Sequence, residues 1–237
     1  MKVVVTGQVG IDKKPFLSRL QSMAQSEGQR LSVFHVGELM YAEAPDVAAG
    51  RILDLPLARL HGLRRSVMKD VLATAKRAEH LAVNTHATFR WRHGLFPAFD
   101  FDQMAELDAD LYVTLIDNVD AIHARLLQDH DLEHSLKDLM VWREEEILAT
   151  ELIACGLGAI GKFVVLARGS GESASRTLFQ LIFRPQMKRV YPSYPMSHVM
   201  DLPDVVAELE RFRRSIERHF IVFDPGRIWP SLYNSGA

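Results

Sequence analysis

The stretch MKVVVTGQVGIDKK (residues 1–14) decides the fold class. Its three consecutive valines, residues 3–5, form a β-branched run that is too short for a helix and suits a strand buried on both faces. The chain then passes through Gly7 and Gly10 to a pair of lysines, and apolar residues recur at helical spacing over residues 15–26. Strand, glycine loop, lysine and helix follow each other in the order of a phosphate-binding loop (P-loop).

This loop departs from the pattern G-x-x-x-x-G-K-[ST] at two positions. Counted from Gly7, Lys13 stands at the lysine position, but Asp12 replaces the second glycine and Lys14 replaces the hydroxyl residue. A carboxylate inside the loop repels phosphate unless it turns outward or pairs with a lysine. By adjacency, Lys14 is expected either to neutralise Asp12 or to place a second cation where the metal would have stood. Loss of the hydroxyl removes a usual Mg²⁺ ligand. The alternative is an ordinary β-turn-α connection with surface lysines.

The composition excludes several classes of protein. A hydrophobic content of 48% and a charged content of 24% in 237 residues are those of a globular protein. The formal net charge of −2 predicts neither a nucleic-acid partner nor a membrane partner. Cys155 is the single cysteine, which excludes a disulfide framework and indicates a reducing cytoplasm. The ten histidines show no H-E-x-x-H or similar spacing, so no metal site is expected from them.

Strand and helix patterns alternate along the chain. Further strands are expected at residues 31–37, 81–87, 111–117 and 163–167, and helices at 57–79, 120–130 and 136–155. The segment WREEEI (142–147) is expected to be a solvated helix face with Trp142 and Ile147 turned inward. This alternation predicts an α/β protein with a parallel sheet and helices on both faces. Ligands of such sheets bind beyond the carboxyl ends of the strands, so we expect one cleft formed by residues 7–14, Gly37, residues 84–86 and Asp117.

The order of the motifs resembles the small P-loop nucleotide kinases, in particular the archaeal-type adenylate kinase-like group. Members of that group carry VVVTG-x-x-G-x-GK-T-T, a G-[DE]-x-M segment and a VDTH strand end. This chain has VVVTGQVGIDKKP (3–15), VGELM (36–40) and VNTHA (83–87). The segments HGLFPAF (93–99) and IHARLLQD (122–129) stand where the group has a Gly-x-x-Pro-Gly loop and an arginine-bearing helix. The resemblance covers roughly residues 1–155.

The resemblance implies that the chain binds ATP and moves its γ-phosphoryl group onto a nucleotide or nucleoside phosphate, with Lys13 and Arg125 as the catalytic residues. The implied ATP-binding residues are Gly7, Gly10, Asp12, Lys13 and Lys14. The implied acceptor-binding residues are Glu38, His86, Arg90 and Arg92. Each of these four also has a structural alternative: a first-turn helix glutamate, a hydrogen-bonding histidine at a strand end, and arginines in a solvated loop.

Three departures from the group favour a second hypothesis. Asn84 replaces the acid associated with Mg²⁺, which leaves the metal uncertain, and Leu126 replaces the second of the paired arginines. The segment HDLEH (130–134) carries no arginine where a lid would clamp the phosphates. The alternative is therefore a non-catalytic nucleotide sensor or scaffold coupled to the C-terminal part of the chain.

The C-terminal part reads as a second βαβ unit, formed by residues 188–199, a helix over 204–220 and a strand over 221–228. The runs VYPSYPMS (190–197) and VFDP (222–225) resemble the opening of nucleoside 2-deoxyribosyltransferase-like proteins, although Tyr194 replaces the glycine of their VY-[LI]-[SA]-G-P motif. We expect a P-loop kinase-like domain over residues 1–183 and a C-terminal unit over 184–237. This unit is either a short addition or the start of a longer domain, and N-glycosidic bond chemistry is a third functional hypothesis.

Overall fold

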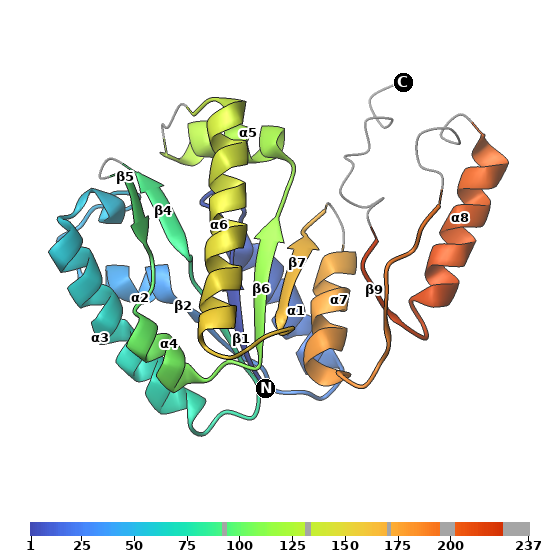
Figure 1. Ribbon diagram of the computed structural model, residues 1–237, viewed down its shortest axis with the longest axis horizontal. Coiled ribbons are helices and arrows are strands. Elements are labelled where there is room, and N and C mark those ends of the chain that lie inside the picture. Colours follow the sequence, from blue (N-terminus) through green and yellow to red (C-terminus); the bar gives the residue numbers. More distant parts are fainter. Residues whose placement is uncertain (92–93, 131–133, 170–171, 195–201, 225–237) are drawn as a thin grey trace.

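The chain forms a parallel sheet between two layers of helices in a computed structural model, which describes residues 1–91, 94–130, 134–169, 172–194 and 202–224 (Figure 1). The sheet has five strands in the order β2-β3-β1-β6-β7, and each neighbouring pair is parallel. The predicted α/β fold class is therefore confirmed. The strands are β1 (Lys2–Thr6), β2 (Ser32–His35), β3 (Leu81–Asn84), β6 (Leu111–Ile116) and β7 (Phe163–Ala167).

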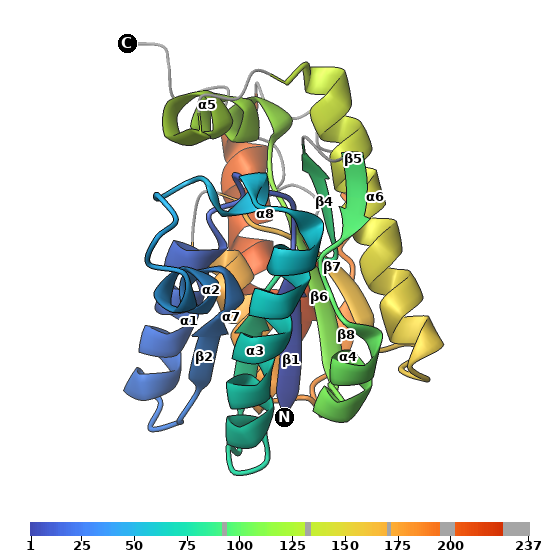
Figure 2. The same ribbon diagram turned by 90° about the vertical axis from the view of Figure 1, so that its left-hand side faces the viewer.

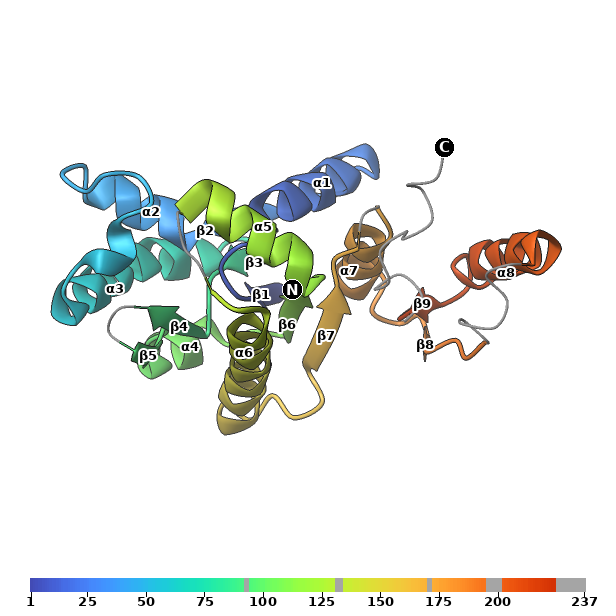
Figure 3. The same cartoon turned by 90° about the horizontal axis from the view of Figure 1, so that it is seen from above.

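Helices cover both faces of the sheet. Seen from above, α1 and α7 lie on one side of it, and α4 and α6 lie on the other (Figure 3). None of the helices in the described ranges is long and apolar enough to cross a membrane. The helices of this layered unit are α1 (Lys13–Ser26), α2 (Val36–Glu43), α3 (Leu57–Ala75), α4 (Phe101–Leu107), α5 (Val119–His130), α6 (Leu136–Gly156) and α7 (Ser173–Phe183), with a 3₁₀ turn at Ile52–Asp54.

Strand β1 is central because its valines are buried on both faces. Val3 and Val5 have no exposed surface, and Val3 pairs with Ala82 of β3 on one side and with Leu111 of β6 on the other. After β1 the chain forms β2 and β3 on one side of β1, and it later forms β6 and β7 on the other side. The loop after β1 therefore lies where the strand order reverses, which is the usual ligand position in open α/β sheets. Figure 2 shows α5 across this end of the sheet.

Two local predictions were wrong. The second strand ends at His35, and Gly37 lies in α2 rather than at a strand end. A solvated loop was the expected structural alternative for the arginines after the third strand, but Arg90 lies in β4 (Thr88–Trp91), which pairs antiparallel with β5 (Gly94–Pro97) in a hairpin. The hairpin forms because Phe89 and Phe96 pair across it, with ring centroids 5.7 Å apart, and both side chains are buried.

The C-terminal unit has the predicted strand, helix, strand order. Strand β8 (Arg189–Val190) and strand β9 (Ile221–Val222) are parallel, and α8 (Pro203–Ile216) connects them. The unit contacts α7, where Thr177 Oγ1 donates a hydrogen bond to the carbonyl oxygen of Val222 at 3.1 Å. Residues 195–201 and 225–228 of the predicted segments lie outside the described residues. The domain division at residue 183 and the deoxyribosyltransferase resemblance stay predictions.

Candidate functional site

The loop after β1 requires glycine at two positions. Gly7 and Gly10 have positive φ angles of 140° and 86°. A Cβ atom on Gly7 would lie 2.8 Å from the carbonyl oxygen of Leu115, and one on Gly10 would lie 3.2 Å from side-chain carbons of Ile122 and Leu126. The loop is thus packed against β6 and α5. Leu126 stands where the archaeal-type adenylate kinase-like group has an arginine, and it is fully buried at this contact.

Asp12 takes the backbone conformation of the glycine that it replaces. Its φ and ψ are 54° and 50°, in the left-handed region that aspartate tolerates better than most residues. Its carboxylate lies 3.2 Å from Nε of Arg125 and 3.8 Å from a terminal nitrogen of Arg168. The prediction that Lys14 neutralises Asp12 is wrong, because the Lys14 ammonium pairs with Glu38 across the cleft mouth.

Arg125 binds the loop at two residues. Besides Asp12, it contacts the carbonyl oxygen of Gly10 at 2.8 Å and Asp117 at 2.9 Å, and Arg168 contacts Asp117 at 3.0 Å. Arg125 does not line the cleft that opens over the loop, and its predicted catalytic role stays a prediction. Sequence reasoning missed Arg168. Its position directly after β7, at the carboxyl edge of the sheet, was the available signal.

Lys13 is buried, with 6% of its surface exposed. Its ammonium donates a hydrogen bond to the carbonyl oxygen of Gly7 at 2.6 Å and lies 3.2 Å from both ring nitrogens of His86. Burial lowers the pKa of Lys13 to about 7, although the negative charge of Glu146 opposes this shift. Burial and the nearby charges of Lys13 and Arg64 lower the pKa of His86 well below its usual value, so His86 is neutral at pH 7.

Glu146 of α6 is fully buried and was missed in the sequence, where WREEEI was interpreted as a solvated face. Its carboxylate accepts hydrogen bonds from backbone N–H groups of Gly7 at 3.0 Å, Ala87 at 2.8 Å and Thr88 at 2.7 Å, and from the Thr88 hydroxyl at 2.8 Å. Trp142 is buried as predicted, and Glu146 lies one helical turn further along the same face. That spacing was the signal for its burial.

A cleft of about 560 Å³ opens over the loop at the carboxyl end of the sheet. Its lining includes residues 8–14, Gly37 and residues 84–86, so the predicted convergence of these segments is confirmed. Asp117 is not in the lining and is linked to the loop through Arg125 and Arg168.

The four expected acceptor-binding residues do not all lie at the cleft. Glu38 and His86 line the cleft. Arg90 does not, because β4 directs it toward α6, where its Nε donates to Glu145 at 3.0 Å. Arg92 lies outside the described residues.

Arg64 of α3 also lines this cleft, and sequence reasoning did not find it. Only 4% of its surface is exposed, and its Nε and Nη1 atoms have no hydrogen-bond partner within the described part of the chain. Its guanidinium lies 5.5 Å from the centroid of the Phe89 ring. Burial lowers its pKa to about 10, so it remains charged at neutral pH. The signal was its position between Leu60 and Met68, one turn from each on the buried face of the helix.

Comparison with protein families identifies the N-terminal part of the chain. The family model described as "AAA domain" matches residues 6–143, more than half of the chain. The chain belongs to this AAA domain family. The match includes the loop, Arg64 and Arg125 of the AAA domain and ends before Glu146 and Arg168.

Solved structures similar to this AAA domain protein include three of low sequence identity. Shikimate kinase from Bacteroides thetaiotaomicron has a TM-score of 0.47 at 12% identity, covering 76% of this chain and 97% of that chain. A gluconokinase from Sinorhizobium meliloti 1021 has 0.39 at 13% identity, covering 77% and 87%. The Deinococcus radiodurans tunicamycin resistance protein has 0.36 at 15% identity, covering 66% and 95%. The finer resemblance to archaeal-type adenylate kinases stays a prediction.

The residues at the two expected Mg²⁺ positions of the AAA domain do not fit a metal ion held by the protein. Lys14 brings a positive charge to the hydroxyl position, and its partner Glu38 neutralises it. The Asn84 amide nitrogen lies 2.8 Å from Nδ1 of His35, so this side chain is engaged and carries no charge. Within the described ranges, no group of three or more His, Cys, Asp or Glu side chains could hold a metal.

Proposed function

We propose that this protein binds ATP or a related nucleotide and transfers its γ-phosphoryl group to a small anionic acceptor. The observation that carries the proposal is the placement of Lys13 and Arg64 in one cleft. Lys13 follows the glycine loop, and Arg64 is a buried guanidinium whose Nε and Nη1 atoms have no hydrogen-bond partner among the described residues. One cation is placed for the donor and the other for the acceptor.

The donor phosphates are expected to bind over the backbone of the loop. The N–H groups at the start of α1 and the positive end of its dipole attract an anion at this position. The Lys13 ammonium would exchange its contact with the Gly7 carbonyl oxygen for the β- and γ-phosphates. Arg125 and Arg168 pair with the Asp12 carboxylate, so Asp12 opposes this binding less than an unpaired carboxylate would.

The acceptor is expected to place an anionic group against Arg64. A guanidinium donates hydrogen bonds in a planar fork that matches a phosphate or a carboxylate, and such a group would supply partners for its Nε and Nη1 atoms. The finer proposal is a nucleoside monophosphate, in keeping with the adenylate kinase-like resemblance. Neutral His86 contacts Lys13 and is close enough to Arg64 for that charge to lower its pKa, and its ring N–H can donate a hydrogen bond to an anionic group of either ligand.

A second candidate function is a nucleotide sensor or scaffold without turnover. The specific observation in its favour is the state of the residues that normally support transfer. Lys14 and Asn84 do not provide metal ligands, and Arg125 is committed to Asp12 and Asp117. A sensor requires the loop and Lys13 but none of these three.

One set of titrations separates the two functions. ATP, ADP and AMP are titrated into the protein by calorimetry, with Mg²⁺ and with a chelator, and the same samples are assayed for ADP formation from ATP plus AMP. The Arg64→Gln variant should lose AMP binding by at least about tenfold and keep ATP binding, because it removes one charge-assisted contact. Its neighbour Arg65 is largely exposed and pairs with Asp100, so Arg65→Gln is the matched control and should change neither.

The outcomes have distinct meanings. Turnover that depends on Arg64 supports phosphoryl transfer. ATP binding without turnover supports the sensor. Absence of binding for all three nucleotides overturns both functions.

A further inference from the structure

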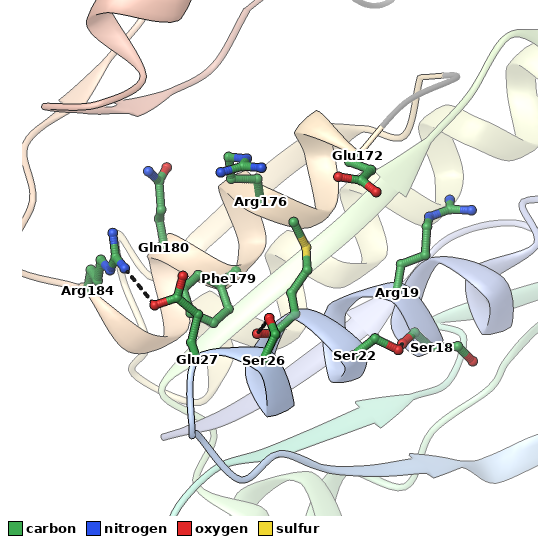
Figure 4. Close-up of a pocket in the computed structure, with 11 residues that line it drawn as sticks. Ser18, Arg19, Ser22, Ser26, Glu27, Glu172, Arg176, Phe179, Gln180 and Arg184 are labelled. Carbon is green, nitrogen blue, oxygen red and sulfur yellow. Dashed lines mark hydrogen bonds and ion pairs between the residues drawn. The ribbon is translucent and has the colours of Figure 1, made fainter.

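A second cavity, of about 530 Å³, lies in the groove between α1 and α7. Figure 4 shows the side chains that line it, which come from α1, from α7 and from the residues that flank these helices. The groove shares no lining residue with the cleft over the P-loop. Its volume is within the range of about 300–1,000 Å³ that is usual for small-molecule sites.

Three arginines line this α1–α7 groove, and two of them lack partners. Arg184 pairs with Glu27 at 3.2 Å and lies 5.7 Å from the centroid of the Phe179 ring. In the described part of the chain, Arg19 and Arg176 take part in no ion pair and no side-chain hydrogen bond, and the Nε atom of Arg19 is shielded from solvent without a partner.

The nearby carboxylates do not neutralise this charge. Glu172 lines the same groove, one helical turn before Arg176, yet no ion pair forms between them. Glu27 is already engaged by Arg184. The groove is therefore lined by more arginines than glutamates. Its two arginines without an ion pair in the described part of the chain come from different helices, Arg19 from α1 and Arg176 from α7 (Figure 4).

We propose that the α1–α7 groove is a second ligand site, which takes a small molecule carrying two or more negative charges of the phosphoryl type. Guanidinium groups match phosphoryl oxygens with paired N–H donors, and a ligand held by Arg19 and Arg176 would supply an acceptor for the shielded Nε of Arg19. Met23 and Phe179 provide an apolar floor for the body of such a ligand.

The proposal is tested by nuclear magnetic resonance of the arginine Nε–H groups during titration with inorganic pyrophosphate. Each signal is assigned by its loss in the corresponding Arg→Lys variant. The signals of Arg19 and Arg176 should shift together with one dissociation constant. Backbone signals of the P-loop report any binding there separately. A response confined to the loop overturns the groove site and leaves the proposed function standing. A response confined to the groove supports the groove site and counts against the proposed function.

A charge-matched pair of variants excludes non-specific attraction. The double variant Arg19→Gln/Arg176→Gln should weaken pyrophosphate binding in the groove by about tenfold or more, measured on the Arg184 signal. The control Arg30→Gln/Arg218→Gln removes the same charge from two exposed arginines outside the groove and should change this affinity by less than about twofold. Thermal melting of both double variants checks folding. Equal weakening in the two double variants overturns the proposal.

Discussion

The backbone N–H of Gly7 donates a hydrogen bond to the Glu146 carboxylate at 3.0 Å, although 139 positions separate the two residues in the chain. The same carboxylate holds the backbone of Ala87 and Thr88 after β3. One side chain of α6 thus fixes both the loop that leads to Lys13 and the segment that follows His86. Its negative charge also acts on the Lys13 ammonium.

The Glu146→Gln variant should lower the free energy of unfolding by about 2–3 kcal/mol, because an amide nitrogen cannot accept the hydrogen bonds that one carboxylate oxygen now receives from Thr88. The measurement is urea unfolding at pH 7. Glu145→Gln is the control: its carboxylate pairs with the half-exposed Arg90, and its loss should cost less than about 1 kcal/mol. Equal losses in the two variants would show that the buried carboxylate has no special role.

The burial of Lys13 predicts a pH dependence of stability with a definite sign. Its pKa in the folded protein is about 7, against 10.5 for the unperturbed side chain. Between these values the unfolded chain binds the proton that the folded chain has released, so stability rises with pH, by up to about 1.4 kcal/mol per pH unit. The rise should vanish in Lys13→Met and persist in a control variant of the exposed Lys69. Chemical unfolding at pH 7, 8 and 9 measures it, and parallel curves for wild type and Lys13→Met would contradict the assignment.

Nucleotide affinity should show the opposite trend. Phosphate binding requires the charged ammonium of Lys13, so the dissociation constant for ATP should increase as the pH rises above about 7. Calorimetric titration over the same pH range measures this effect. A flat affinity profile would mean that Lys13 does not contact the phosphates.

The order of strands and helices was predictable because it rests on local periodicity. The valines of β1 and the apolar spacing of α1 and α3 place these elements within a few residues of their observed bounds. The hairpin at residues 88–97 was not predicted, because its stability depends on one aromatic pair across the strands rather than on a turn signal.

The backbone segments that form the cleft were predictable from the sequence, but the pairing of its charged side chains was not. Strand ends in a parallel sheet converge by topology, which brought the loop, Gly37 and residues 84–86 together. The pairing of charges depends on side-chain directions in three dimensions. Asp12 therefore binds two distant arginines rather than its neighbour Lys14. Arg64 was missed for a related reason: the sequence alone does not show whether a charged side chain on an apolar helix face reaches solvent.

The Arg64→Met variant should be more stable than the wild type by about 1 kcal/mol. It replaces a buried charge, which forms no ion pair within the described ranges, by an apolar side chain of similar length. Acceptor binding should fall at the same time. Urea unfolding measures the first effect and AMP titration the second. A large loss of stability would instead assign Arg64 a structural role through its contact with Phe89.

The double variant Asp12→Gly/Lys14→Thr should make ATP binding dependent on Mg²⁺. Glycine adopts the positive φ of residue 12 without strain, and its introduction removes the carboxylate from the loop. Threonine at position 14 supplies the hydroxyl ligand that the present loop lacks. We expect ATP affinity to be at least about tenfold higher with Mg²⁺ than with a chelator in this variant, as a new metal ligand worth about 1.4 kcal/mol would give.

The single variants separate the two contributions to this gain. Asp12→Gly alone should improve ATP binding with and without Mg²⁺, because it removes a negative charge and leaves the metal position unchanged. Lys14→Thr alone breaks the contact with Glu38 and should create only part of the Mg²⁺ dependence while Asp12 remains in the loop. If the double variant binds ATP equally with Mg²⁺ and with chelator, the loop does not position a metal even with a standard motif. The missing Mg²⁺ ligand would then be the one at Asn84, whose amide contacts His35. Asn84→Asp is the variant to add in that case.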